Sequence, residues 1–227
     1  MGARFGASLV AAATAFVILG ATILPFTTPA YVRLEQDRAG VAIASYTPAD
    51  LDRVADALLG DLLFWRGDFG VAVAGSSVLS PREVGHMQDV RGVFAGFLAL
   101  VVASLVVLAV AFRRARDAEA RAATWRAVAS GARALAIGLA VVGAFVILAF
   151  DAAFEVFHRL FFSAGSYTFD PATDHLVQLF PQQFWSDTAV AVGAASFVVA
   201  LVTAWRASAR GSVARPTAVL APSKART

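Results

Sequence analysis

The 227-residue sequence has no cysteine and few charged residues, which make up 15% of it, against about 25% in an average soluble domain. Without cysteine, the chain cannot form disulfides, cysteine-ligated zinc sites, iron–sulfur clusters, a thiol nucleophile or a CxxC redox pair. Hydrophobic residues make up 59% of the chain and the mean hydropathy is +0.69, which exceeds what a soluble core of this length can bury. Aromatic residues make up 11%, which excludes a disordered chain. The composition therefore indicates a membrane protein.

Four apolar stretches have about the length that a helix needs to cross a bilayer, roughly 20 residues. They lie at residues 5–26, 93–112, 135–150 (extended upstream from residue 130) and 188–205. All four are rich in Ala, Gly and Val, and small residues allow membrane helices to pack closely. The predicted fold class is an all-α membrane protein with four transmembrane helices in a compact bundle and a helical loop domain on its outer face.

The distribution of the 19 Lys and Arg residues predicts the topology. Most of them fall at the N-terminus, in the link between the second and third spans, or after the fourth span; the link holds Arg113, Arg114, Arg116, Arg121, Arg126 and Arg133. The positive-inside rule then places both termini in the cytoplasm and two polar loops, 31–91 and 151–187, outside. This basic balance needs no nucleic-acid partner.

The domain prediction is a transmembrane unit over residues 1–207 and a disordered cytoplasmic tail over 208–227, rich in small and basic residues. The chain is expected in the cell membrane as a multi-pass protein whose immediate partner is the lipid bilayer. A cleaved signal peptide is the competing interpretation of the first stretch.

Two helix starts can be read in the first outer loop. Thr47-Pro48-Ala49-Asp50 combines a hydroxyl cap, a proline and an acid, and an amphipathic pattern follows it. This helix lies either on the bilayer surface or on the bundle. Ser80-Pro81-Arg82-Glu83 repeats the pattern and predicts one long helix over 81–114, which continues into the second span.

Three histidines are present, and all fall in the outer loops: His86, His158 and His175. His86 and His158 lie at matched depth, just above the outer ends of the second and third spans. Because a short basic link joins those spans, we expect the spans to be neighbours and the two imidazoles to face each other. Neutral imidazoles exchange protons near physiological pH. His175 has no such partner and is interpreted as a hydrogen-bonded structural residue.

Other interpretations of the histidines are weaker. A metal site would have to combine His86, Asp89, Glu155 and His158, and no HExxH-like spacing supports it. Haem ligation by two histidines usually uses the bundle core rather than its rim. The serines lack a nucleophile elbow. Neither a metal nor another cofactor is predicted.

Two segments resemble signatures of a known family. Residues 80–90, SPREVGHMQDV, resemble a motif S-x-R-E-x-x-H-(L/M)-x-D-V, and residues 154–162, FEVFHRLFF, resemble F-x-x-F-H-x-x-F-F. Residues 167–171, together with Phe180, Pro181 and Phe184, resemble the end of the second block, with Tyr167 where tryptophan is expected. The family consists of small bacterial integral membrane proteins and includes the lipoprotein intramolecular transacylase.

The resemblance implies an enzyme that moves an ester-linked acyl chain within the lipidated N-terminal cysteine of a diacylated lipoprotein. The chain passes from the diacylglyceryl group to the cysteine α-amine, which leaves a lyso-form. The family's two functional histidines correspond to His86 and His158. The alternative is a non-catalytic membrane scaffold or a lipid- or haem-binding protein. Oligomeric state is left open.

Supporting roles can be assigned to neighbouring residues. Glu155 or Asp89 would orient an imidazole. Asp151 is a further supporting residue, since 151, 155 and 158 share one helical face. Arg82, Arg91 or Arg159 would stabilise an oxyanion. The aromatic residues predicted to bind substrate are Phe161, Phe162 and Tyr167.

Overall fold

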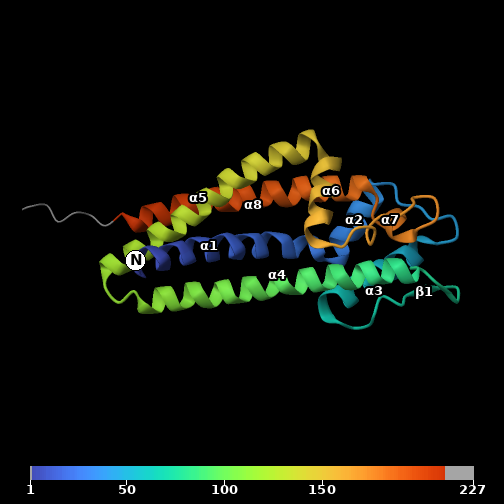
Figure 1. Ribbon diagram of the computed structural model, residues 1–227, viewed down its shortest axis with the longest axis horizontal. Helices are drawn as coiled ribbons and strands as arrows, with labels where there is room; N and C mark the ends of the chain where they lie inside the picture. Colours follow the sequence, from blue (N-terminus) through green and yellow to red (C-terminus); the bar gives the residue numbers. More distant parts are fainter. Residues whose placement is uncertain (1, 213–227) are drawn as a thin grey trace, which may run out of the picture.

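The computed structural model describes residues 2–212, with side chains from residue 4 onward. Four long helices dominate it, and each is long and apolar enough to cross a membrane. They are α1 (Gly2–Ile23), α4 (Pro81–Arg114), α5 (Ala118–Leu148) and α8 (Gln182–Gly211) (Figure 1). The stretches 93–112 and 188–205 lie within α4 and α8, whereas 5–26 and 135–150 run three and two residues past the ends of α1 and α5. The all-α membrane fold with four spans is confirmed.

Helix α1 lies in the middle of the bundle, between α4 on one side and the paired helices α5 and α8 on the other (Figure 1). The helices pack through small residues: Ala129, Ala132 and Ala200 are fully buried, and Thr22 and Ser196 share a hydrogen bond of 2.7 Å between their hydroxyl oxygens. The compact small-residue bundle is thus present. The expectation that the second and third spans are neighbours is wrong, because α4 and α5 hardly touch.

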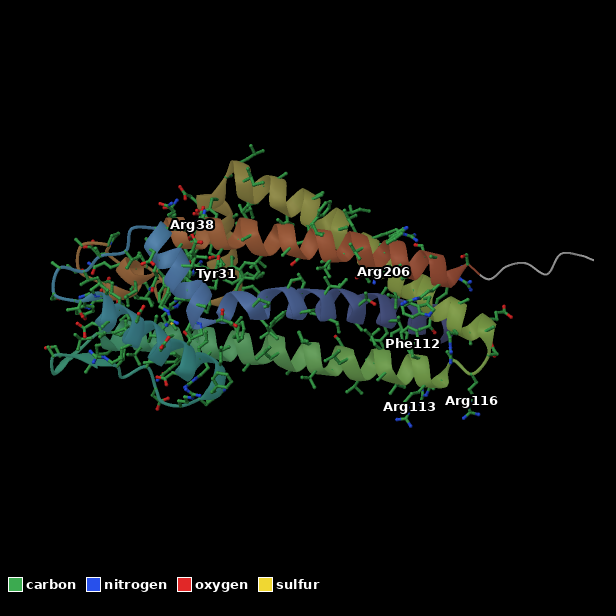
Figure 2. All side chains as sticks on the ribbon, turned by 180° about the vertical axis from the view of Figure 1, so that it is seen from behind. Tyr31, Arg38, Phe112, Arg113, Arg116 and Arg206 are labelled. Atoms are coloured by element: carbon green, nitrogen blue, oxygen red, sulfur yellow. The ribbon has the colours of Figure 1, made fainter. Side chains whose placement is uncertain are left out.

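Both chain ends that the structure describes lie at the same end of the bundle as the α4–α5 link (Figure 1). We call this the basic end, because Arg113, Arg116 and Arg206 are found there, whereas Tyr31 lies at the opposite end (Figure 2). The central position of α1 buries Val10 and Ile18, so this helix contributes to the packing of the bundle.

The opposite end, the loop end, carries the short elements: the 3-10 helix η1 (Leu24–Thr27), α2 (Pro29–Arg38), α3 (Pro48–Phe64), the antiparallel strands β1 (Ala72–Val73) and β2 (Ser76–Ser77), α6 (Phe150–Phe161) and α7 (His175–Leu179). Their core contains Val54, Leu58, Phe69, Val78, Leu79, Met87, Leu176 and Leu179. This small hydrophobic core binds the two loops into one layer on top of the bundle.

Helices α3 and α4 begin where the sequence predicted. Thr47 and Asp50 form a complete capping box at the start of α3, and Ser80 and Glu83 do the same for α4. Helix α3 buries Val54 and Leu58 in the loop-end core, so its apolar face packs on the protein rather than on the bilayer.

The third span, α5, ends at Leu148, just before the second outer loop. The helix breaks at Ala149, where φ is −149° and ψ is 58°, and α6 begins as a separate helix. Helix α6 runs from the end of α5 across the bundle towards α4 (Figure 1). At the other end, α8 extends to Gly211, so the first four residues of the predicted tail, 208–211, are helical. Residues 213–227 of the predicted tail lie outside the described residues.

Candidate functional site

His86 lies in the first turns of α4, before the apolar run of that helix, and only 7% of it is exposed. Burial, helped by the nearby imidazole of His158 and opposed by Asp89, lowers the pKa of His86 from 6.5 to about 4. His86 is therefore neutral at physiological pH. Its Nδ1 atom is buried and has no hydrogen-bond partner within the described structure.

His158 lies near the end of α6 and is 8% exposed. Its ring stacks on that of His86, with the centroids 6.0 Å apart and the planes inclined by 22°. The two imidazoles face each other as expected, but for a different reason. Because α6 turns away from α5 and crosses towards α4, it brings His158 to His86 although the two spans are not neighbours.

Nδ1 of His158 lies 2.8 Å from the backbone carbonyl oxygen of Phe154. A carbonyl oxygen only accepts, so Nδ1 carries the proton and donates it to this hydrogen bond. In the neutral ring Nε2 is then unprotonated. The Phe154 carbonyl oxygen thus fixes the orientation of the imidazole, as the carboxylate does in a catalytic triad, and leaves Nε2 as a basic nitrogen.

Aromatic side chains surround the pair. The ring of Phe162 lies 4.8 Å from that of His86 and 5.5 Å from that of His158. Phe169 contacts His86, and Tyr167 contacts His158, at centroid distances of 5.5 and 5.0 Å. This enclosure excludes water from the imidazoles and accounts for the low pKa of His86.

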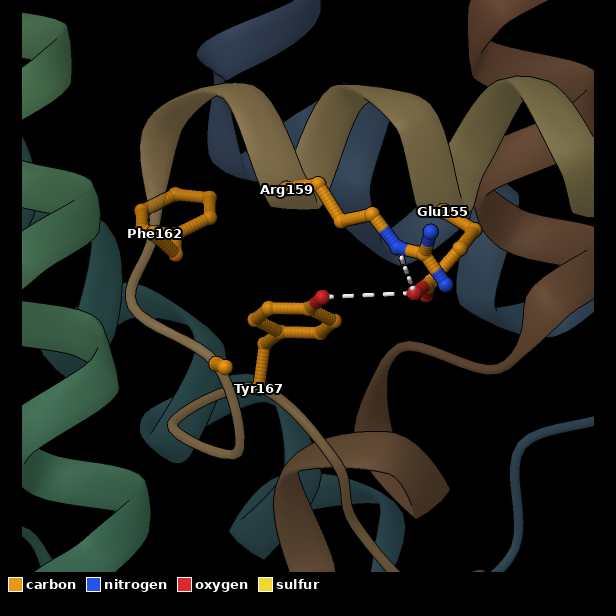
Figure 3. Close-up of a pocket in the computed structure, with 5 residues that line it drawn as sticks. Glu155, Arg159, Phe162 and Tyr167 are labelled. Carbon is orange, nitrogen blue, oxygen red and sulfur yellow. Dashed lines mark hydrogen bonds and ion pairs between the residues drawn. The ribbon is translucent and has the colours of Figure 1, made fainter.

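A cavity of about 360 Å³ adjoins this aromatic wall, lined by Glu155, Arg159, Phe162, Ala164 and Tyr167 (Figure 3). Arg159 Nε donates to Glu155 Oε1 at 2.7 Å, and the Tyr167 hydroxyl donates to the same oxygen at 3.3 Å. The hydrogen bond from Arg159 holds the pKa of Glu155 below its usual value. The cavity thus offers one carboxylate and one guanidinium beside the histidine pair.

Two of the arginines predicted to stabilise an oxyanion instead bind other residues of the loop end. Arg91 is buried, donates to Gly67 O at 2.9 Å and to Asp68 Oδ1 at 3.0 Å, and stacks over Trp65. Arg82 donates to Asp174 at 2.7 Å and lies over Phe169. Both hold the loop end together, which leaves Arg159 as the predicted oxyanion-stabilising arginine that lines the cavity.

The remaining predicted residues do not line the cavity. Asp151 accepts a hydrogen bond from Gln182 at the start of α8, and Asp89 is exposed. Phe161 is 46% exposed and packs on Phe157 rather than on the histidines. His175 begins α7, where its Nδ1 bonds to the Val78 carbonyl oxygen at 2.6 Å, as expected for a structural residue.

Two residues that help to build the site, Glu83 and Phe169, had no such role in the sequence analysis. Glu83 is 1% exposed; besides capping α4, it accepts a hydrogen bond from the Leu176 backbone at 2.6 Å. The capping box identified the first role but gave no sign of the second. Phe169, which packs on His86, belongs to the 167–171 segment but had no assigned role. Among residues 4–212 no group of three or more His, Asp or Glu is arranged to hold a metal.

Comparison with known proteins identifies a matching family and similar solved structures. The model of the lipoprotein intramolecular transacylase Lit family matches residues 10–185. The solved structure of membrane-integral Lit from Bacillus cereus has a TM-score of 0.75 at 17% identity, covering 92% of this chain and 95% of that one. Two further structures of that protein, with a histidine replaced by arginine or by alanine, have TM-scores of 0.68 at 17% identity. They cover 92% and 90% of this chain, respectively, and 91% of each of those chains.

A search of curated proteins finds no match. The family match spans most of the chain, and both the four-helix membrane fold and the paired histidines were established independently of it. The chain belongs to the lipoprotein intramolecular transacylase family, whose members are membrane-integral acyltransferases acting on lipoproteins.

Proposed function

We propose that His86 and His158 carry the proton transfers of the intramolecular acyl transfer. The cysteine α-amine of a diacylated lipoprotein attacks an ester carbonyl of its own diacylglyceryl group. A C–N bond forms, the ester C–O bond breaks, and the amine proton passes to the glyceryl oxygen through the histidines. The observation that carries this proposal is the buried stack of the two imidazoles, with centroids 6.0 Å apart.

His158 is the base in this scheme. Its Nδ1–H is fixed by the Phe154 carbonyl oxygen, so Nε2 is free to accept the amine proton. His86 is neutral at physiological pH because its pKa is lowered to about 4, partly by His158. The pair therefore holds one extra proton at a time. General acid–base catalysis of this kind increases the reaction rate by about 10²–10⁴-fold.

No protein nucleophile is required, since the amine and the ester belong to one molecule. Holding them together supplies a large effective concentration. The cavity supports this arrangement: Glu155 suits the α-ammonium before it loses its proton, and Arg159 suits the carbonyl oxygen as it gains charge (Figure 3). The exposed Phe157, Leu160 and Phe161 of α6 suit contact with acyl chains.

The proposed orientation puts the basic end, with both termini, in the cytoplasm and the histidine pair on the extracytoplasmic side. Reporter fusions test it. A reporter inserted in the 40–45 segment should be active only outside the cell, and one after Arg121 only inside. An externally active fusion after Arg121 would contradict this orientation.

Mass spectrometry of a lipoprotein's N-terminal peptide, from cells with and without this chain, tests the reaction. We expect an N-acylated lyso-form only when the wild-type chain is present. His86→Gln and His158→Gln should each lower its formation by about 100-fold or more, while the matched control His175→Gln should retain most activity. Wild-type rates in the His158→Gln protein would refute the two-histidine mechanism. Absence of the lyso-form with wild type would favour a binding or scaffold role.

A further inference from the structure

A second cavity of about 360 Å³ lies at the basic end, between α5 and α8. It is lined by Arg126, Ala129, Arg133, Ser208, Gly211 and Ser212. It is separate from the histidine pair, which lies at the loop end on α4 and α6. The transacylation mechanism uses none of these residues.

Arg126 and Arg133 reach this cavity from one face of α5, because seven residues make about two helical turns. Nη1 of Arg126 donates to Gly211 O at 3.1 Å, and Nη2 of Arg133 donates to Ser208 Oγ at 2.7 Å. A guanidinium has five N–H donors. Each side chain is exposed and makes one hydrogen bond within the described part of the chain, so both keep further N–H donors for an added ligand.

The charge around the cavity is not balanced by the described part of the chain. Every ion pair among residues 4–212 involves arginines of the loop end, namely Arg33, Arg38, Arg53, Arg82, Arg91 and Arg159. Arg126 and Arg133 have no carboxylate within ion-pair distance in that part. Both guanidinium groups are therefore available to an anion.

A phosphate matches these donors. Guanidinium groups bind phosphate oxygens in pairs, whereas Ser208 and Ser212 already donate their hydroxyl protons to the backbone oxygens of Ala204 and Ala209. The same face of α5 continues from Arg133 through Ile137 and Val141, which are 66% and 67% exposed. Apolar side chains placed four and eight residues beyond an arginine suit an acyl chain that descends from the phosphate into the bilayer.

We infer that this cavity binds the phosphate head group of an anionic phospholipid, with an acyl chain along Ile137 and Val141. Free phosphate shares the head-group chemistry but makes no use of the apolar face. The site stands on its own observations and does not depend on the proposed transacylation. It would hold the lipid in the leaflet at the basic end, where anionic lipid favours clustered arginines.

Native mass spectrometry of the full-length protein in detergent, titrated with phosphatidylglycerol or phosphatidylcholine, tests the assignment. Phosphatidylglycerol should bind at least about tenfold more tightly, the effect of about one charge-assisted hydrogen bond. The Arg126→Gln/Arg133→Gln variant should lose this preference. The control Arg113→Gln/Arg116→Gln removes the same charge from the last turn of α4 and the link after it (Figure 2) and should keep the preference.

Arg126→Lys/Arg133→Lys keeps the charge but loses the paired donors, so it should fold even if the Gln variant does not, and should bind several-fold more weakly than wild type. Equal losses in the cavity and control variants, or equal affinity for both lipids, would overturn the site. A third titration with inorganic phosphate separates the two sources. Phosphate that displaces phosphatidylglycerol at micromolar concentration would overturn the lipid assignment, and weak competition supports it.

Discussion

The imidazoles of His86 and His158 stack 6.0 Å apart although their helices, α4 and α6, are separated in the chain by the whole of α5. The contact depends on the helix break at Ala149, which directs α6 across the bundle. A continuous third helix would carry His158 away from α4 along the direction of α5. The break is therefore as important to the candidate site as the histidines themselves.

The stability of the protein should fall in acid because of His86. Its pKa is lowered to about 4 in the folded state by burial and by His158, against 6.5 when unperturbed. Between these values the unfolded chain binds the extra proton, so stability decreases as the pH falls from 6.5 towards 4. Thermal unfolding in detergent across this range should show the slope. His86→Phe should flatten it; an unchanged slope would contradict the buried neutral imidazole.

Glu35→Gln should stabilise the protein at neutral pH. Burial raises the pKa of Glu35, Arg38 opposes the shift and Asp187 adds to it. Oε1 of Glu35 is buried and has no hydrogen-bond partner among the described residues. A carboxyl whose folded pKa is raised loses stability as the pH rises through that pKa. We expect the melting temperature to increase by a few degrees at pH 7.5 and by less at pH 4.5. Asp37→Asn, an exposed change on the same helix, should have little effect.

Glu83→Ala should cost about 2–4 kcal/mol of unfolding free energy. The substitution removes the acceptor of two backbone N–H groups, those of Ser80 at 2.7 Å and Leu176 at 2.6 Å. Ser80→Ala removes only the 3.4 Å cap to Glu83 N and should cost about 1 kcal/mol. Denaturant titration of both variants compares them. Equal costs would mean that the link from α4 to α7 contributes nothing.

Gly131→Ala should destabilise the bundle much more than Gly138→Ala. A Cβ at Gly131 would overlap the backbone carbonyl of Ala11, whereas one at Gly138 meets nothing within 4 Å. Both glycines lie in α5, so the two changes have the same intrinsic helix propensity gain, up to about 1 kcal/mol. Melting temperatures should drop for Gly131→Ala and rise slightly for Gly138→Ala. Similar values would show that α1 and α5 do not pack closely here.

The sequence by itself determined the features that depend on local patterns. Apolar length gave the four spans, and the caps at Thr47 and Ser80 gave the starts of α3 and α4. These signals are reliable because a span or a capped turn is specified by residues a few positions apart. The matched depth of His86 and His158 above two spans also indicated the residues that meet, although those spans are not neighbours.

Only the tertiary structure decided how those features are brought together. It inserted α1 between α4 and α5, broke the third helix at Ala149, and packed α3 on the protein. It also tied Arg82 and Arg91 to the loop end and left Arg159 in the cavity. Such outcomes depend on which helix faces are complementary across the whole bundle, and residues distant in sequence decide that together.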